Sequence, residues 1–239
     1  VPTVAFGADE RDTVAMLQRV AGAMLRSDGT YAVADGGSSQ VKYFDGGGRF
    51  LSAVGRSGQG PGEYEYIAWL LACGGDSAYV SDIGNNQVSV LDAGGRLVRR
   101  FRLMTSEVAA TPFSTACSRS GHIVTSGWGT TPRDVTPSRP YRPQVAVDLS
   151  RADGGVRHAL GSFPGTEMTP VMGGAGPTLG GRWLRIGIGN RQAWLAPNDG
   201  RGLIAVDTTG VVRQVVRLAS DDKAMTAADV AFLIRQTLD

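Results

Sequence analysis

Residues 28–51 read DGTYAVADGGSSQVKYFDGGGRFL, and residues 76–98 return to the same pattern as DSAYVSDIGNNQVSVLDAGGRLV. Matching positions in the two stretches are separated by 47 residues. Four pairs of identical residues hold this register: Asp35 and Asp82, Gln40 and Gln87, Asp45 and Asp92, and Gly48 and Gly95. A fixed period of this length indicates one structural unit repeated along the chain.

Each repeat alternates short apolar stretches with turn signals. In the first repeat, the stretches at 31–35 and 40–44 flank a tight Gly/Ser turn, and the D-x-x-G turn at 45–48 leads to a further stretch. An apolar stretch also precedes each repeat, at Val20–Leu25 and at Ile67–Ala72. Each unit therefore has four predicted strands, and four-stranded units at intervals of about 40 to 50 residues are typical of β-propeller blades.

Fainter copies of the unit follow within residues 121–148 and 193–207. The turn aspartates of the four units are spaced by 47, 56 and 59 residues, namely Asp45, Asp92, Asp148 and Asp207. The wider spacing predicts insertions in the third and fourth units. We predict an all-β protein, one β-propeller domain over residues 1–239 with four blades of four strands.

The end of the chain has a helical pattern instead. Thr226–Asp229 forms a capping box, and apolar residues then recur at helical spacing from Val230 to Leu238. This pattern predicts a short amphipathic helix within residues 220–239. We expect the helix to pack on the bottom or edge of the propeller, with docking of a partner as the alternative.

Composition and charge exclude several classes of function. The chain has 24 basic and 22 acidic residues, a net charge of +2 that is too balanced for a nucleic-acid-binding surface. No run of about 18 apolar residues is present, so no membrane span is expected. The only cysteines, Cys73 and Cys117, form no C-x-x-C motif and have no Cys/His cluster around them, which excludes a thioredoxin-like or zinc-finger site.

The chain offers few groups for catalysis or cofactor binding. His122 and His158 are the only histidines, and neither accompanies a recognisable nucleophile motif. The glycine-rich stretches at 58–62 and 187–192 complete neither a dinucleotide-binding nor a P-loop motif. We therefore predict no catalytic residue, no cofactor and no metal. We expect the side-chain oxygens of the tight turns to accept hydrogen bonds from the backbone of their own turn rather than to bind a metal. The residues concerned are Asp35, Asp82, Asn85 and Asn86.

The segment Gly55–Tyr64, GRSGQGPGEY, together with Tyr79–Asp92, resembles the linker and repeat of bacterial NHL-like six-bladed β-propeller proteins. The resemblance is strongest over residues 19–103. It implies a propeller in which the Gly-Pro-Gly linker turns the chain from one blade to the next. Four blades are fewer than six, so we expect a ring that is incomplete or short, or a further part of the protein beyond this sequence.

The two cysteines take equivalent places in neighbouring units. Each lies six residues before the first apolar position of the second strand of its unit, Tyr79 or Ile123. Inner strands of adjacent blades bring such positions towards the Cα separation of about 4.4 to 6.8 Å that a disulfide requires. Both a disulfide and two buried thiols are consistent with this placement.

Two long segments leave the blades, at 126–143 and 163–183, and concentrate proline, aromatic, methionine and arginine residues. Because strands alternate in direction, a loop between the second and third strands and a connector between blades emerge at the same end. This composition is typical of protein interfaces. The predicted interface residues are Tyr64, Tyr66, Trp128, Arg133, Arg139, Tyr141, Arg142, Met168 and Met172.

These features favour a non-enzymatic protein-binding or scaffold propeller. The resemblance and the cysteines imply a location in the periplasm or elsewhere outside the bacterial cytoplasm, with membrane association only through partners or a removed leader. An accessory subunit on the periplasmic face of a membrane complex fits this description, and a photosynthetic reaction centre is one candidate host. The alternative is a small-molecule-binding, hydrolase-type or lyase-type propeller with an axial metal site.

Overall fold

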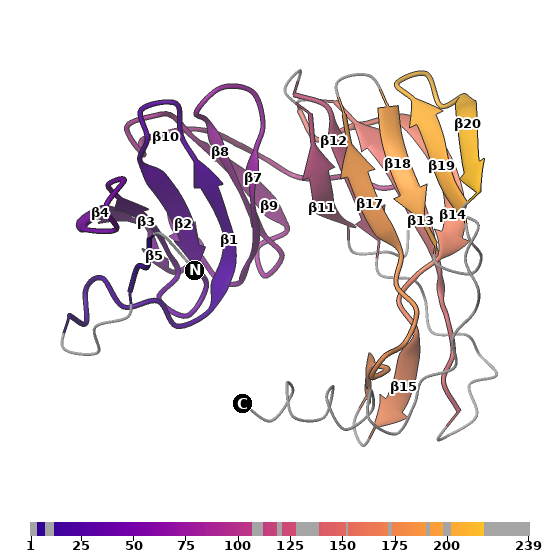
Figure 1. The fold of residues 1–239 in the computed structure, drawn as a ribbon, viewed down its shortest axis with the longest axis horizontal. Coiled ribbons are helices and arrows are strands. Elements are labelled where there is room, and N and C mark those ends of the chain that lie inside the picture. Colours follow the sequence, from indigo (N-terminus) through magenta and orange to yellow (C-terminus); the bar gives the residue numbers. More distant parts are fainter. Residues whose placement is uncertain are drawn as a thin grey trace.

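Four four-stranded antiparallel sheets make up most of the computed structural model of the chain (Figure 1). The structure describes residues 4–7, 12–106, 112–118, 121–127, 139–151, 153–171, 174–189, 192–197 and 202–217. Outside these ranges lies the predicted C-terminal helix within residues 220–239, with its capping box. Three predicted interface residues also lie outside them: Trp128, Arg133 and Met172.

The four sheets follow one another in sequence, so each is one blade. Blade 1 contains β1 (Val20–Leu25), β2 (Tyr31–Asp35), β3 (Gln40–Phe44) and β4 (Phe50–Val54). Blade 2 contains β7 (Ile67–Ala72), β8 (Ala78–Asp82), β9 (Gln87–Leu91) and β10 (Leu97–Phe101). Blade 3 contains β11 (Pro112–Cys117), β12 (Ile123–Gly127), β13 (Gln144–Ser150) and β14 (Val156–Pro164). Blade 4 contains β17 (Arg185–Ile188), β18 (Gln192–Ala196), β19 (Gly202–Asp207) and β20 (Val212–Arg217).

Successive blades pack face to face, which places the core between them. The first strands of the blades, β1, β7, β11 and β17, contact one another in chain order. Buried clusters join blade 1 to blade 2 around Ile67, blade 2 to blade 3 around Ile123, and blade 3 to blade 4 around Leu195. The all-β propeller prediction is confirmed, and the 47-residue repeat corresponds to one blade.

The N-terminal segment covers the face of blade 1 that points away from blade 2. Phe6, Ala15 and Leu17 pack against Phe44 and its neighbours there. The rings of Phe6 and Phe44 lie with their centroids 5.3 Å apart. The segment before the first strand is therefore part of the folded unit.

Buried aspartates fasten the chain as it enters blades 1 and 2. Asp35, at the end of β2, accepts hydrogen bonds from the amides of Gln18 and Arg19, at 3.2 and 3.0 Å. Asp82, at the end of β8, does the same for the amides of Glu65 and Tyr66, at 3.0 and 2.8 Å. Since these amides lie outside the sheet ladders, the carboxylates supply partners that the backbone needs when it is buried.

The same aspartates also shape the tight turns that follow them. Asp82 accepts from the amides of Gly84 and Asn85, and the Asn85 side chain donates to it at 2.7 Å. The turns end on Ser39 and Asn86, both in the left-handed region with φ of 55° and 49°. These contacts agree with the turn role predicted for Asp35, Asp82, Asn85 and Asn86.

Blade 3 corrects one sequence-based assignment. The spacing of the repeats predicts Asp148 to be a turn aspartate, but it lies inside β13. A 2.9 Å hydrogen bond from the Gly154 amide to the Arg151 carbonyl closes the turn instead. The reason is that this turn has arginine where the others have aspartate. Asp148 is fully buried and instead accepts from the Thr105 hydroxyl and the Ser106 amide, at 2.9 and 2.8 Å.

Replacing Asp82 with alanine is expected to destabilise the protein by about 3 kcal/mol, because each buried donor left without a partner costs about 1–3 kcal/mol. The matched control is Asp92→Ala in the exposed turn of the same blade, where Asp92 also accepts from two backbone amides. We expect this control to cost about 1 kcal/mol or less. Urea denaturation measures the unfolding free energy of both variants. Equal losses would show that Asp82 does not hold the chain as it enters blade 2.

Acid is expected to weaken the hydrogen bonds that the Asp35 carboxylate accepts. Burial raises the pKa of Asp35, but hydrogen bonds from the Ser38 hydroxyl, the Arg19 amide and Lys42 outweigh it and bring the pKa to about 2. The lowered pKa means that the folded state favours the ionised form, so this stabilisation is complete above about pH 5 and is lost as pH falls from about 4 to about 2.

The double variant Asp35→Asn, Lys42→Gln removes both members of the buried pair, whose charged atoms lie 3.2 Å apart. The difference in unfolding free energy between wild type and variant should shrink by about 2 kcal/mol between pH 5 and pH 2. A difference that stays constant over this range would show that Asp35 does not titrate as described.

Candidate functional site

Two insertions emerge from the same end of blades 3 and 4. One joins β12 to β13, and the other joins β14 to β17 and contains the hairpin of β15 (Met168–Val171) and β16 (Gly174–Pro177). Figure 1 shows β15 extending away from the ends of the blades. We call the described part of these insertions, together with Arg185 at the start of β17 (Arg185–Ile188), the loop platform: residues 139–143, 163–171 and 174–185.

Backbone hydrogen bonds join the two insertions. The Tyr141 amide donates to the Met168 carbonyl at 2.9 Å, and the Met168 amide donates to the Tyr141 carbonyl at 2.8 Å. The Gly165 amide donates to the Pro143 carbonyl at 2.8 Å. A two-stranded hairpin is marginally stable alone, so this third segment gives the β15–β16 hairpin the support it needs.

Arg142 fastens the platform to blade 4. Its guanidinium donates to the carbonyls of Pro164 at 3.0 Å, Gly165 at 2.9 and 2.7 Å, and Pro197 at 2.6 Å. Pro197 directly follows β18. The planar guanidinium has five donors in a fixed arrangement, which suits it to bridging several carbonyls. Arg142, predicted as an interface residue, is thus occupied by the protein's own backbone.

An ion pair closes the other side of the hairpin. The Glu167 carboxylate accepts from the backbone amide and from Nε of Arg182, both at 3.0 Å. The Glu167 amide donates in turn to the Arg182 carbonyl at 2.8 Å. The side-chain and amide hydrogen bonds from Arg182 lower the pKa of Glu167, so the pair persists as a charged one at neutral pH.

The platform presents apolar and arginine side chains together. Val171 and Leu179 are 58% and 50% exposed, and Tyr141 is half-buried beside Met168. The exposed arginines are Arg139, Arg182 and Arg185. Sequence reasoning missed Val171, Leu179, Arg182 and Arg185, although the first two flank glycine-rich turns in the predicted segment. An apolar residue beside a glycine-rich turn is the sequence signal that points to Val171 and Leu179.

The other predicted interface residues divide into buried and exposed ones. Tyr64 is only 1% exposed, and burial raises its pKa to about 12, so it is a core residue between blades 1 and 2. Tyr66 is 48% exposed, with the Arg19 guanidinium 4.2 Å above its ring. Met168, the first residue of β15, is 7% exposed. The expectation of a surface role is therefore wrong for Tyr64, because the blade interface closes over it.

The linker between blades 1 and 2 is organised by Glu63. Its carboxylate accepts from the Gly60 amide at 2.7 Å and from Nη2 of Arg56 at 2.6 Å, and these contacts lower its pKa. A side chain at Gly58 or Gly60 would collide with this carboxylate. The glycines of GRSGQGPGEY thus fold the linker, as the resemblance implies.

Both histidines lie in blade 3, His122 just before β12 and His158 within β14. Nε2 of His122 lies 2.8 Å from Nη1 of Arg157, and burial, followed by the charge of Arg157, lowers the pKa of His122. His158 is half-buried in β14. Among the residues that the structure describes, no three His, Cys, Asp or Glu side chains lie together as a metal site would require.

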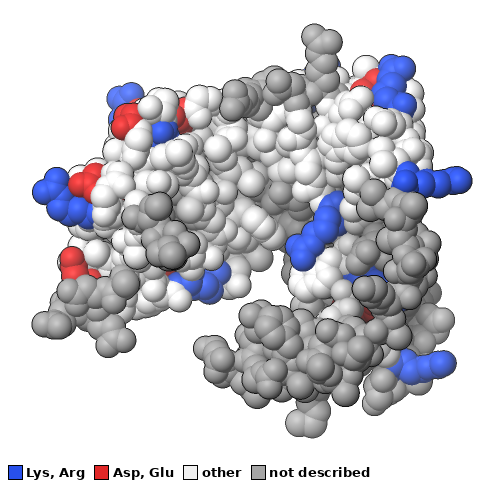
Figure 2. Space-filling view, viewed as in Figure 1, with Lys and Arg blue, Asp and Glu red and all other residues white. Residues whose placement is uncertain are grey.

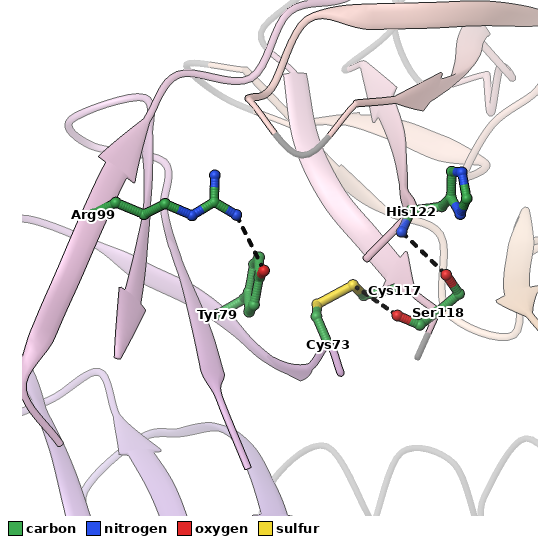
Figure 3. Close-up of a disulfide and its surroundings, with 6 residues drawn as sticks. All are labelled: Cys73, Tyr79, Arg99, Cys117, Ser118 and His122. Atoms are coloured by element: carbon green, nitrogen blue, oxygen red, sulfur yellow. Dashed lines mark hydrogen bonds between the residues drawn. A yellow bond between two sulfur atoms is a disulfide. The ribbon is translucent and has the colours of Figure 1, made fainter. Parts of the chain in front are cut away.

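A disulfide links blades 2 and 3 (Figure 3). Cys73 follows β7, Cys117 ends β11, and their Cα atoms are 5.3 Å apart. Cys73 is 3% exposed and belongs to the cluster that contains Tyr79 and Ile123. The cross-link therefore joins the first strands of two adjacent blades.

No helix within the described ranges is long and apolar enough to cross a membrane.

Comparison with known proteins supports the fold. A family model described as a six-bladed β-propeller matches residues 17–117, which cover blades 1 and 2 and the first strand of blade 3. The resemblance to a six-bladed β-propeller family is confirmed over that range. No curated protein matches the sequence.

Solved structures with a similar fold include enzymes. A streptogramin B lyase is 13% identical, with 83% of this chain and 54% of that one covered and a TM-score of 0.49. An inactive variant of virginiamycin B lyase from Staphylococcus aureus with quinupristin is 12% identical, with 87% and 59% covered and a TM-score of 0.46. Hydrazine synthase from Kuenenia stuttgartiensis is 13% identical, with 81% and 66% covered and a TM-score of 0.45. The chain thus spans little more than half the length of the two lyases.

Replacing Arg142 with alanine should loosen the platform without unfolding the blades. The carbonyls of Pro164, Gly165 and Pro197 lose charge-assisted hydrogen bonds, so local opening should become easier by about 2 kcal/mol. Chymotrypsin should then cut the platform about 30-fold faster, while the urea midpoint changes little.

Arg139→Ala is the control for this experiment, since Arg139 is an exposed arginine three residues away in the same segment. Its cleavage rate should match that of wild type. Equal cleavage of Arg142→Ala and wild type would show that Arg142 does not hold the platform together.

Proposed function

We propose that this β-propeller is a non-enzymatic protein-binding subunit and that the loop platform is its docking surface. The observation that carries the proposal is the construction of the platform: two insertions held together by Arg142 and by the Tyr141–Met168 bridge. Such ordering lowers the entropic cost of binding, since the loops do not need to be fixed by the partner.

The exposed side chains support the same proposal. The platform exposes Val171 and Leu179 as well as Arg139 and Arg182, and apolar residues with arginine are enriched at the centres of protein interfaces. Single exposed apolar residues are common on protein surfaces. Val171 and Leu179 lie on an insertion that belongs to none of the four blade sheets, so binding explains their exposure better.

The disulfide supports a location outside the bacterial cytoplasm, because such cross-links persist in oxidising compartments such as the periplasm. An accessory role on a membrane complex facing that compartment stays a prediction from the sequence. The alternative of an axial metal site would require ligands beyond the described residues, in which no suitable group of three lies together.

Photo-crosslinking tests the docking surface directly. A crosslinking amino acid replaces Val171 on the platform or, as control, Val98 in β10; both valines are 58% exposed. We expect a specific adduct from Val171 alone in an extract of the source organism. The crosslinked protein is then purified and titrated against the unmodified propeller.

Val171→Asp should weaken that binding by about 2 kcal/mol, or about 30-fold, while Val98→Asp leaves it unchanged. Equal effects of the two substitutions would overturn the platform as the docking surface. A stoichiometric metal or small molecule in the purified protein, with no adduct from Val171, would favour the enzyme or ligand-binding alternative.

A further inference from the structure

Charge is distributed unevenly along the chain. Residues 1–103 contain ten basic and eleven acidic residues, whereas residues 104–239 contain fourteen basic and eleven acidic ones. The excess of positive charge therefore belongs to the half of the chain that forms blades 3 and 4. Figure 2 shows the same difference, since on blades 1 and 2 most basic groups adjoin acidic ones, whereas several on blades 3 and 4 stand apart from them.

At the turns between the third and fourth strands, arginines are neutralised by their own turn. Nε of each arginine lies 3.2, 3.1 or 2.6 Å from an aspartate oxygen. The pairs are Arg49 with Asp45, Arg96 with Asp92, and Arg213 with Asp207. These arginines serve the turn and add little net charge to the surface.

The platform arginines are arranged differently. Arg139, Arg182 and Arg185 are all exposed, and Glu167 is the only acidic residue in the described platform. Glu167 bonds to Arg182, which still has 52% of its side chain exposed. The guanidinium of Arg185 lies 4.9 Å above the Trp183 ring, and this cation–π contact holds it in place.

These arginines and the exposed apolar residues lie on segments that backbone hydrogen bonds join. Backbone hydrogen bonds connect the segment of Arg139 and Tyr141 to Met168, and Glu167 to Thr178 and Arg182. Leu179 directly follows Thr178, and Val171 ends β15. Positive charge and apolar side chains therefore occur together within one hydrogen-bonded unit.

We infer that the loop platform recognises an acidic protein segment, one whose carboxylates alternate with apolar side chains. This inference rests on the proposed function. Arginine binds carboxylates through charge-assisted hydrogen bonds, and the platform already contains one, from Nε of Arg182 to the Glu167 carboxylate. Val171 and Leu179 would contact the apolar residues of the segment.

An acidic protein fits better than a membrane surface or a nucleic acid. Juxtamembrane lipid recognition uses clusters of about four to eight basic residues, and the described platform exposes three arginines. Nucleic-acid recognition requires a more extended basic surface on a strongly basic domain.

The test uses the full chain and three probes. The first is a 20-residue peptide of Glu interspersed with Leu and Tyr, the second is the same peptide with every Glu replaced by Gln, and the third is a phosphatidylglycerol vesicle. We expect the Glu peptide to bind at least about tenfold more tightly than the Gln peptide at low salt, and to lose this advantage in about 0.5 M NaCl.

Charge reversal locates the site. Arg139→Glu and Arg185→Glu should each weaken binding of the Glu peptide by about tenfold or more. Arg151→Glu is the matched control, an equal charge change at the turn between β13 and β14, at the other end of blade 3. Melting temperatures of all variants are measured on the same samples to confirm that they are folded.

Equal binding of the Glu and Gln peptides, or equal effects of Arg151→Glu and Arg139→Glu, would overturn the acidic-partner inference. Vesicle binding without peptide binding would replace it with a lipid surface. If Val171→Asp weakens binding of the crosslinked partner but the arginine reversals do not, the acidic-partner inference is wrong and the platform remains the docking surface. If the partner also ignores Val171→Asp, the proposed function itself fails.

Discussion

A backbone that leaves a β-ladder and becomes buried must find new hydrogen-bond partners, and in this protein buried charged side chains supply them. Asp35, Asp82 and Asp148 accept from amides of the segments that lead into blades 1, 2 and 3. Arg142 instead donates hydrogen bonds to backbone carbonyls, those of Gly165 in the loop platform and of Pro197 after β18. The positions of blades 1, 2 and 3 relative to their connectors depend on the aspartate contacts.

These contacts explain how a chain with 34 glycines in 239 residues can hold a defined shape. Glycine-rich turns let the backbone approach closely, but they offer no side chains to fix it. One aspartate that bonds to both the connector and the turn fixes two flexible segments at once. At the junction of blades 2 and 3, the disulfide of Cys73 and Cys117 adds a covalent restraint to the apolar packing. Blades 3 and 4 are thereby a firm base for the platform, whose surface carries the proposed binding.

The blades could be predicted from sequence because their signals are local. Asp, Gly and Asn in the turns, and alternating apolar residues between them, determine strand and turn within a few residues. Blade 3 shows the limit of this approach, since Arg151 occupies the turn position and Asp148 was assigned to it instead. Tyr64 shows another limit: an aromatic residue in a polar linker looks exposed until the next blade packs over it. The contacts of Arg142 with Gly165 and Pro197 join segments 23 and 55 residues away, and no local pattern encodes them.

Hydrogen exchange of individual amides tests most directly whether buried charged groups fix the connectors and the platform. Three amides outside the blade sheets are informative. Those of Tyr66 and Ser106 lie in connectors and donate to Asp82 and Asp148. That of Met168, at the start of a short hairpin, donates to the Tyr141 carbonyl. We expect these three amides to exchange as slowly as amides in the centre of a blade, such as that of Val80, and far more slowly than the amide of Gly94 in an exposed turn. Exchange of Tyr66, Ser106 and Met168 at the rate of Gly94 would contradict this expectation.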